Sequence, residues 1–379
     1  MQYPIYLDYN ATTPLDPTVL EKMLPYFREH FGNASSTAHV YGWMAEEAVE
    51  QARQEIASVI NARPNEIIFT SGATESCNLA IKGYAEANQH KGNHIITVST
   101  EHKAVLDVCD YLNKKGFEIT YLPVDNNGMI DLGLLENSIQ SKTLMIAAMY
   151  SNNETGVIHP IKEIAGISEK HGICFFTDAT QSFGKVKIDV HAENIDLMAF
   201  SSHKIYGPKG VGGLYIRNRQ PSIKLATLIH GGGHENKLRS GTLNVPGIVG
   251  FGAAGLLSMD LQKNDLQNYL QLNEALSNGI KKMNGVNINA VGAVRMPNVL
   301  NICFDLEGGE GLLKKISKHV AVASGSACSS AIVEPSHVLT AMGLDRRKAN
   351  SSVRFSFGRT TTLHEIQRTF DFIQEALNI

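Results

Sequence analysis

The chain has 379 residues, of which 43% are hydrophobic and 19% are charged, and its formal net charge is -3. This composition excludes a disordered, collagen-like or coiled-coil protein. The near balance of 34 basic and 37 acidic residues excludes a global charge that would attract nucleic acid or an anionic membrane. No run approaches the roughly 18 apolar residues of a membrane span, and the first residues lack the order of a signal peptide. We therefore expect a soluble cytoplasmic protein.

Short apolar runs alternate with segments of helical period through the first two thirds of the chain. Such alternation predicts βαβ units, and hence an α/β fold with a mainly parallel sheet. After about residue 261 the pattern changes to a long polar helix, reaching to about Met283, and then to short strands and a final helix, which predicts a second, smaller α+β domain. The predicted strands of the first part are Glu66–Thr70, His94–Ser99, Glu118–Leu122, Thr143–Tyr150, Ile173–Asp178, Ile195–Phe200 and Gly212–Ile216.

The first candidate binding element is Ser71–Ser76, which follows a predicted strand and begins a predicted helix. Its small residues let the backbone approach a ligand closely. The N–H groups of the helix start and the Thr74 hydroxyl could together bind an anion, most naturally a phosphate. An ordinary capped helix start is the alternative.

Two charged side chains follow two successive predicted strands. Asp178 ends one strand, and Lys204 lies just beyond the next. Ligands of open parallel sheets bind beyond the carboxyl ends of strands, so both side chains could face one crevice. Lys204 could form a Schiff base, and Asp178 could pair with a protonated pyridine nitrogen. The alternatives are an exposed loop lysine and an aspartate that caps a turn.

Cys328 stands among small residues in the stretch Ala321–Ser330. This setting predicts an accessible loop thiol, which needs help from its surroundings to act as a nucleophile. An incidental loop thiol is the alternative. The other four cysteines lie in or beside apolar patterns and are predicted to be core residues. No C-x-x-C pair or His/Cys cluster indicates an intrinsic metal site.

Six groups of residues, taken together and in this order, resemble the cysteine desulfurases of the NifS and IscS branch. They are Tyr6–Pro14, Thr70–Ser76, Asn152–Gly156, Ser201–Gly213, Gly231–Glu235 with Arg239–Thr242, and Ser324–Cys328.

The resemblance implies a homodimeric fold-type I enzyme dependent on pyridoxal 5'-phosphate. In this fold a large domain, residues 13–261, has a seven-stranded, mainly parallel sheet flanked by helices. A smaller α+β domain, residues 1–12 and 262–379, carries Cys328. The implied reaction converts L-cysteine to L-alanine and passes the sulfur on as a persulfide.

The resemblance also implies roles for residues around the cofactor ring. Lys204 would bind the cofactor covalently, Asp178 would pair with the pyridine nitrogen, and Gln181 would bond the ring hydroxyl. His102 would stack on the ring and act as an acid or base. Asn153 would lie beside the cofactor.

The implied phosphate ligands are Ala73, Thr74, Ser201 and His203, with Thr242 reaching in from the partner subunit. At the other end of the site, Asn153 and Arg354 would receive the substrate carboxylate, because a planar guanidinium suits bidentate carboxylate binding.

In the implied sulfur step, Cys328 would accept the sulfur and deliver it to an acceptor protein, such as an iron–sulfur scaffold or a sulfurtransferase. Cys328 could contact an iron–sulfur cluster only transiently. A selenocysteine lyase or aminotransferase of the same fold, and a catalytically idle scaffold, are the alternatives.

Overall fold

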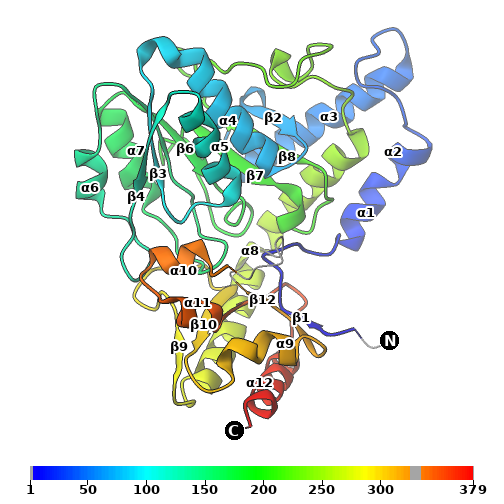
Figure 1. Ribbon diagram of the computed structural model, residues 1–379. Coiled ribbons are helices and arrows are strands. Elements are labelled where there is room, and N and C mark those ends of the chain that lie inside the picture. The colour runs from blue at the N-terminus through cyan, green and yellow to red at the C-terminus, as the bar shows by residue number, and fades with distance from the viewer. Residues whose placement is uncertain (1–2, 325–333, 379) are drawn as a thin grey trace.

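The computed structural model describes residues 3–324 and 334–378. Figure 1 shows a larger part with a central sheet and a smaller part below it, joined by helix α8 (Val245–Ile280).

The large sheet has seven strands in the order β2-β8-β7-β6-β5-β3-β4. All seven correspond to predicted strands, most with ends shifted by one to three residues. β8 is antiparallel to both of its neighbours, and all other pairings are parallel. A short connection suffices between β7 and β8 because antiparallel neighbours need no crossover. The strands are β2 (Ile67–Thr70), β3 (His94–Val98), β4 (Glu118–Leu122), β5 (Thr143–Ala147), β6 (Cys174–Asp178), β7 (Leu197–Ser201) and β8 (Gly212–Ile216).

Both faces of this sheet are covered, which explains why its central strands are apolar throughout. Alternate residues of one strand therefore enter different cores. In β6, Phe175 packs with the core under α3, α7 and α8, whereas Cys174 and Phe176 pack with the core under α4 and α5. The helices of this part are α1 (Pro17–Met23), α2 (Pro25–Arg28), α3 (Val40–Val59), α4 (Ala73–Asn88), α5 (Lys103–Lys114), α6 (Leu132–Asn137) and α7 (Ile161–Lys170).

The smaller part is built on an antiparallel sheet in the order β12-β13-β10-β9. Its core also takes in the second half of α8 and α12. The N-terminal strand β1 (Ile5–Tyr6) pairs with β11 (Val320–Ala321), so the two ends of the chain contribute to the same part. The remaining elements are β9 (Val286–Ile288), β10 (Val299–Phe304), β12 (Ala323–Ser324), β13 (Ser352–Ser356), α9 (Leu312–Ile316), α10 (His337–Ala341), α11 (Arg346–Asn350) and α12 (Leu363–Leu377).

Helix α8 is continuous through residue 261, where the sequence suggested a boundary between domains. Its glycine-rich first half packs closely on α3: a Cβ on Gly252 would lie 2.8 Å from the Ala52 Cα atom. Its second half packs with the small-sheet core through Leu272 and Leu276. By length and composition α8 could match a membrane span. However, half of its most apolar 18-residue stretch is buried inside the protein, as in a core helix.

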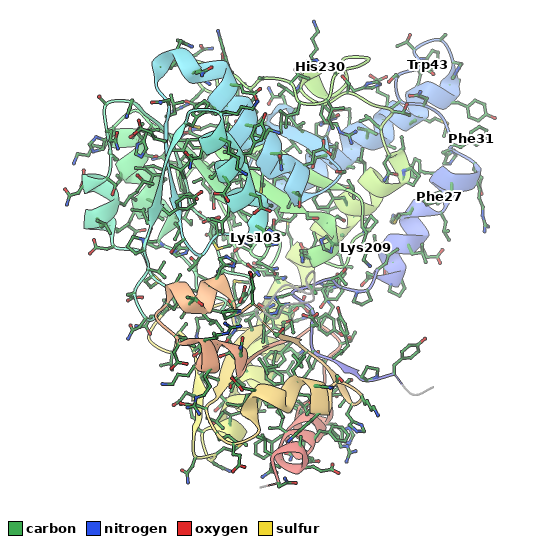
Figure 2. The ribbon with its side chains drawn as sticks, viewed as in Figure 1. Phe27, Phe31, Trp43, Lys103, Lys209 and His230 are labelled. Atoms are coloured by element: carbon green, nitrogen blue, oxygen red, sulfur yellow. The ribbon has the colours of Figure 1, made fainter. Side chains whose placement is uncertain are left out.

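One edge of the large part exposes aromatic side chains. Figure 2 places Phe27, Phe31 and Trp43 along the edge formed by α2 and the start of α3. Phe31 is 66% exposed and Trp43 is 52% exposed, and Tyr41 is also exposed. We call Phe27, Phe31, Tyr41 and Trp43 the α2–α3 aromatic face.

Candidate functional site

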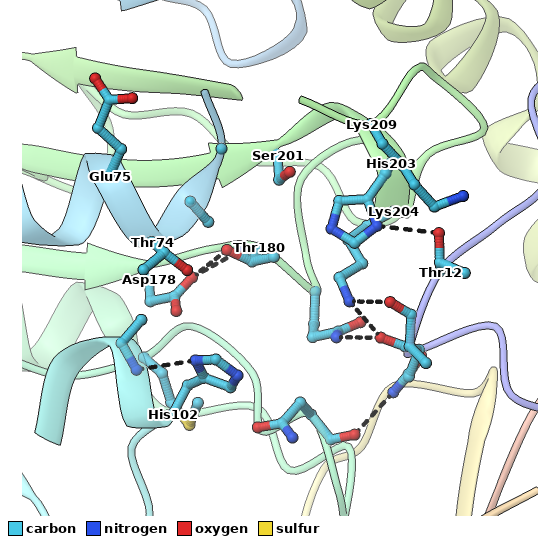
Figure 3. Close-up of a pocket in the computed structure, with 18 of the residues that line it drawn as sticks. Thr12, Thr74, Glu75, His102, Asp178, Thr180, Ser201, His203, Lys204 and Lys209 are labelled. Atoms are coloured by element: carbon cyan, nitrogen blue, oxygen red, sulfur yellow. Dashed lines mark hydrogen bonds between the residues drawn. The ribbon is translucent and has the colours of Figure 1, made fainter. Parts of the chain in front are cut away.

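A cavity of about 620 Å³ lies beyond the carboxyl ends of β6 and β7, at the start of α4 (Figure 3). Almost every predicted site residue lines it. Thr242 is exposed and is not among the described residues around this cavity, and Cys328 lies outside the described residues. The predicted residues in the lining are Ala73, Thr74, His102, Asn153, Asp178, Gln181, Ser201, His203, Lys204 and Arg354.

Lys204 lies in a single 3-10 turn that directly follows β7. Its Nζ atom donates hydrogen bonds to the carbonyl oxygens of Asn10 and Ala11, both at 2.6 Å. Burial and the nearby Arg354 guanidinium lower the pKa of Lys204 to about 8, against an opposing effect of Asp8 and Asp178. Near neutral pH, Lys204 is therefore a free amine, the nucleophilic form, in a larger share of the protein molecules than an ordinary lysine would be.

Asp178 ends β6 and is nearly buried, on the side of the cavity opposite Lys204 (Figure 3). Its Oδ1 atom accepts hydrogen bonds from the Thr180 backbone N–H at 2.9 Å and from the Thr180 hydroxyl at 2.5 Å. Asp178 thus caps the following turn, as the alternative interpretation held, and also faces the cavity. The two Thr180 bonds fix the orientation of the carboxylate toward a ligand.

His102 is the N-cap of α5, and its Nδ1 atom accepts the Ala104 backbone N–H at 3.1 Å. Since Nδ1 is an acceptor here, a neutral His102 ring carries its proton on Nε2. Figure 3 shows the ring on the same side of the cavity as Asp178. His102 is therefore placed to donate or take a proton inside the cavity.

The α4 end of the cavity is suited to a phosphate. The N-cap of α4 is Gly72, which makes no side-chain capping bond, so the first N–H groups of the helix are available to an anion. A Cβ on Gly212 would lie 2.6 Å from the Gly72 Cα atom, so only glycine fits beside this turn. Burial and nearby lysines lower the pKa of His203 to about 4, so His203 is neutral at physiological pH.

Arg354, on β13 of the small sheet, forms the opposite end. Its Nη1 atom donates to the Asn153 carbonyl at 2.9 Å, and its Nη2 atom to Asp8 at 2.6 Å. The Nε atom is buried and has no hydrogen-bond partner among the described residues. An unpartnered donor of this kind indicates a binding role, because buried polar atoms are normally paired. The guanidinium and Asn153 can together receive a carboxylate.

The sequence did not predict roles for Asn10 and Thr12, although both stand in the Tyr6–Pro14 segment of the resemblance. The Asn10 carbonyl accepts from Lys204 and, at 3.0 Å, from the Gln181 amide. The Thr12 hydroxyl lies 3.1 Å from Nδ1 of His203. No side-chain pattern could have revealed the Asn10 role, because it is played by a backbone atom.

The residues present fit pyridoxal phosphate. The uncapped helix start suits its phosphate, Asp178 suits its ring nitrogen, and the partly deprotonated Lys204 suits its aldehyde. The cavity is large enough for the ring and a small amino acid together, since binding pockets are commonly about 300–1,000 Å³.

Comparisons with known proteins agree with this geometry. The model of the class-V aminotransferase family matches residues 5–369. The cysteine desulfurase IscS of Anaeromyxobacter sp. (strain Fw109-5) is 50% identical over 376 residues, which cover 99% of this chain and 93% of that protein. The chain belongs to the cysteine desulfurase family.

Solved structures place this desulfurase-family chain in the same fold. A NifS-like protein matches with a TM-score of 0.92 and 37% identity over 99% of both chains. The structure of SspA in complex with cysteine matches with a TM-score of 0.83 and 39% identity, over 93% of this chain and 98% of that one. The expected fold-type I architecture is thereby confirmed, and pyridoxal 5'-phosphate is the cofactor of the family.

Proposed function

We propose that this desulfurase converts L-cysteine to L-alanine and transfers the sulfur, as a persulfide on Cys328, to an acceptor protein in a cytoplasmic pathway such as iron–sulfur cluster assembly. The observation that carries the proposal is the cavity that brings Lys204, Asp178 and His102 together with Arg354. The names of its relatives, cysteine desulfurase IscS, support the same reaction.

Different residues of the cavity bind the substrate and transfer protons. Arg354 and Asn153 receive the substrate carboxylate. Bound pyridoxal phosphate supplies an electron sink that makes the Cα proton of the substrate removable. Lys204, as the free amine, takes that proton, and Asp178 stabilises the positive charge on the ring nitrogen. His102 serves as a second acid or base at Nε2.

The sulfur step balances without an external oxidant. The Cys328 thiolate attacks the substrate sulfur, so an S–S bond forms while the Cβ–S bond breaks. The electron pair of the broken bond remains on the carbon, which is protonated to the methyl group of alanine. Described residues on both sides of the Cys328 segment lie close to the cavity: Ala323 pairs with Arg354, and Ser336 bonds Glu154.

Two variants of the cofactor-loaded protein test the reaction. Lys204→Ala is expected to lose the visible absorbance of the attached cofactor and to lower alanine formation at least about 100-fold. Cys328→Ser is expected to keep the absorbance and lose sulfur release. If Cys328→Ser still delivers sulfur to a thiol acceptor at the normal rate, the persulfide role is wrong.

The same assay separates the alternatives. An aminotransferase would form an oxo acid, with no need for Cys328. A selenocysteine lyase would turn over selenocysteine but leave cysteine unchanged. An idle scaffold would show no change of absorbance with any amino acid.

We further propose that the protein is a homodimer whose interface includes the α2–α3 aromatic face. Exposed aromatic side chains gathered at one edge are typical of an interaction surface. The exposure of Thr242 supports this, since Thr242 is not among the described residues that line the cavity of its own chain. Its loop is held rigidly, because Arg239 pairs with Glu75 at 2.9 Å and Arg53 pairs with Glu235 at 2.8 Å.

Sedimentation at several concentrations tests the dimer. Phe31→Glu combined with Trp43→Glu is expected to yield monomers with weaker cofactor binding, because Thr242 of the partner is lost. Val291→Glu is the matched control, since Val291 is also an exposed apolar residue but lies on the small part. A monomeric wild type, or a double variant that still dimerises fully, would contradict the proposed interface.

A further inference from the structure

Helix α10 begins between two loops that line the cofactor cavity. Its N-cap is Ser336, whose Oγ atom accepts the Leu339 backbone N–H at 3.2 Å and donates to Oε2 of Glu154 at 2.6 Å. Ser336 is 2% exposed and Glu154 is 6% exposed, so the bond is shielded from water. It joins α10, which follows the Cys328 segment in the chain, to the loop that follows β5.

The backbone around Glu154 is fixed independently of Ser336. The Asn152 side chain accepts the Glu154 N–H at 2.9 Å, and Asn301 donates to the Glu154 carbonyl at 3.2 Å. The preceding Asn153 carbonyl accepts from Arg354. The Glu154 carboxylate therefore projects from the same rigid loop that would receive the substrate carboxylate.

A second bond holds the start of α10 to the other side of the cavity. Nε2 of His337 lies 2.9 Å from the Glu101 carbonyl, immediately before His102. Adjacent residues Ser336 and His337 thus contact the two loops that carry Asn153 and His102.

Burying a carboxylate is unfavourable without a strong partner. Burial raises the pKa of Glu154 to about 7, against the opposing effects of the Ser336 hydrogen bond and the Arg354 charge. The ionised Glu154 side chain is therefore destabilised by burial at this position, one residue after Asn153. The proposed reaction gives Glu154 no chemical step that would explain this penalty.

We propose that Glu154 is a positioning residue for sulfur transfer: by accepting the Ser336 hydroxyl, it fixes the start of α10, and so the downstream attachment of the Cys328 segment, to the loop that carries Asn153. The inference rests on the proposed function of Cys328. It predicts that loss of the Glu154–Ser336 bond slows the step that needs the Cys328 thiol. Binding of an amino acid at the cofactor, which needs no thiol, is unaffected.

Two measurements on the cofactor-loaded protein separate these steps. Titration with L-alanine, followed through the visible absorbance of the cofactor, measures amino-acid binding without Cys328. The initial rate of alanine formation from L-cysteine includes the thiol step. A general loss of structure would change both, whereas loss of positioning changes only the second.

Glu154→Ala and Ser336→Ala remove the bond from opposite sides. Each is expected to lower kcat for L-cysteine about tenfold, the effect of about 1.4 kcal/mol, and to leave the Kd for L-alanine within about twofold. The double variant is expected to be no slower than the slower single variant, because both remove the same bond. Glu154→Gln keeps an acceptor for the Ser336 hydroxyl and is expected to retain most of the rate.

Ser317→Ala is the matched control, since Ser317 is exposed and its hydroxyl donates to the nearby Lys314 carbonyl, far from Glu154 in the chain. The inference is overturned if Glu154→Ala and Ser336→Ala turn over cysteine at the wild-type rate, if their effects add, or if L-alanine binding weakens as much as kcat falls. A wild type that forms no alanine, or a Cys328→Ser variant that forms it normally, would instead refute the proposed function.

Discussion

The lowered pKa of Lys204 leads to a quantitative prediction about cofactor capture. Only the free amine can attack the aldehyde of pyridoxal phosphate. With a pKa of about 8, in place of the ordinary lysine value of 10.5, the neutral fraction of Lys204 at pH 7 rises from about 0.03% to about 10%. The larger neutral fraction is therefore expected to speed cofactor capture by up to about 300-fold over an ordinary lysine with equal access, an upper limit because a less basic amine is also a weaker nucleophile.

Stopped-flow absorbance after mixing the cofactor-free protein with pyridoxal phosphate measures this rate as a function of pH. The rate is expected to rise with pH and to level off above about pH 8. Arg354→Leu removes a neighbouring positive charge and shifts the midpoint upward, whereas Asp8→Asn removes a negative charge and shifts it downward. The same reaction with Nα-acetyl-lysine corrects for titration of the cofactor itself. A rate that keeps rising tenfold per pH unit to pH 10 would refute a lowered pKa.

Two further predictions concern stability, measured by urea unfolding. Burial raises the folded-state pKa of Glu154 to about 7 from its ordinary value of 4.5. Between these two values the folded protein holds a proton that the unfolded chain has lost, so stability falls as pH rises through this window. Glu154→Gln should therefore reduce the loss of stability between pH 5 and pH 8 by up to about 3 kcal/mol, and an unchanged pH profile would contradict this. Arg53→Met leaves the buried Glu235 carboxylate without its ion-pair partner and should cost about 3–5 kcal/mol, whereas Lys170→Met in the exposed pair with Glu136 should cost less than about 1 kcal/mol; equal losses would refute the role of burial.

The sequence predicted all seven strands of the large sheet because each is a short apolar run between turns and helical segments. It did not predict that β8 runs antiparallel, since strand direction depends on pairing and not on local composition. The first half of α8 was also not assigned to the long helix. Gly250, Gly252 and Gly255 weaken helix propensity there, and close packing on α1 and α3 compensates for that loss.

The site was predictable to different degrees. Asp178, Lys204 and Thr74 stand at strand ends or a helix start, where the sheet topology brings them together. Their positions beside predicted elements were therefore enough to identify them as candidate site residues. Arg354 belongs to the other sheet, and its place in the cavity depends on how the two parts pack. Its role came only from the resemblance.

Contacts made by the backbone, or between distant segments, left no sequence signal. The Asn10 carbonyl that binds Lys204 carries no side-chain pattern. The hydrogen bond between Glu154 and Ser336 joins positions that are remote in the chain. The sequence around each residue is that of an ordinary polar loop.

The central claim is that sulfur leaves L-cysteine at this cavity and is first held on Cys328. Mixing the cofactor-loaded protein with one equivalent of L-cysteine, and analysing the products and the proteolytic peptides by mass spectrometry without reductant, tests it most directly. The account predicts one additional sulfur atom on the peptide that contains Cys328 for each alanine formed. Alanine formed in equal amount while that sulfur is absent from the Cys328 peptide would contradict it.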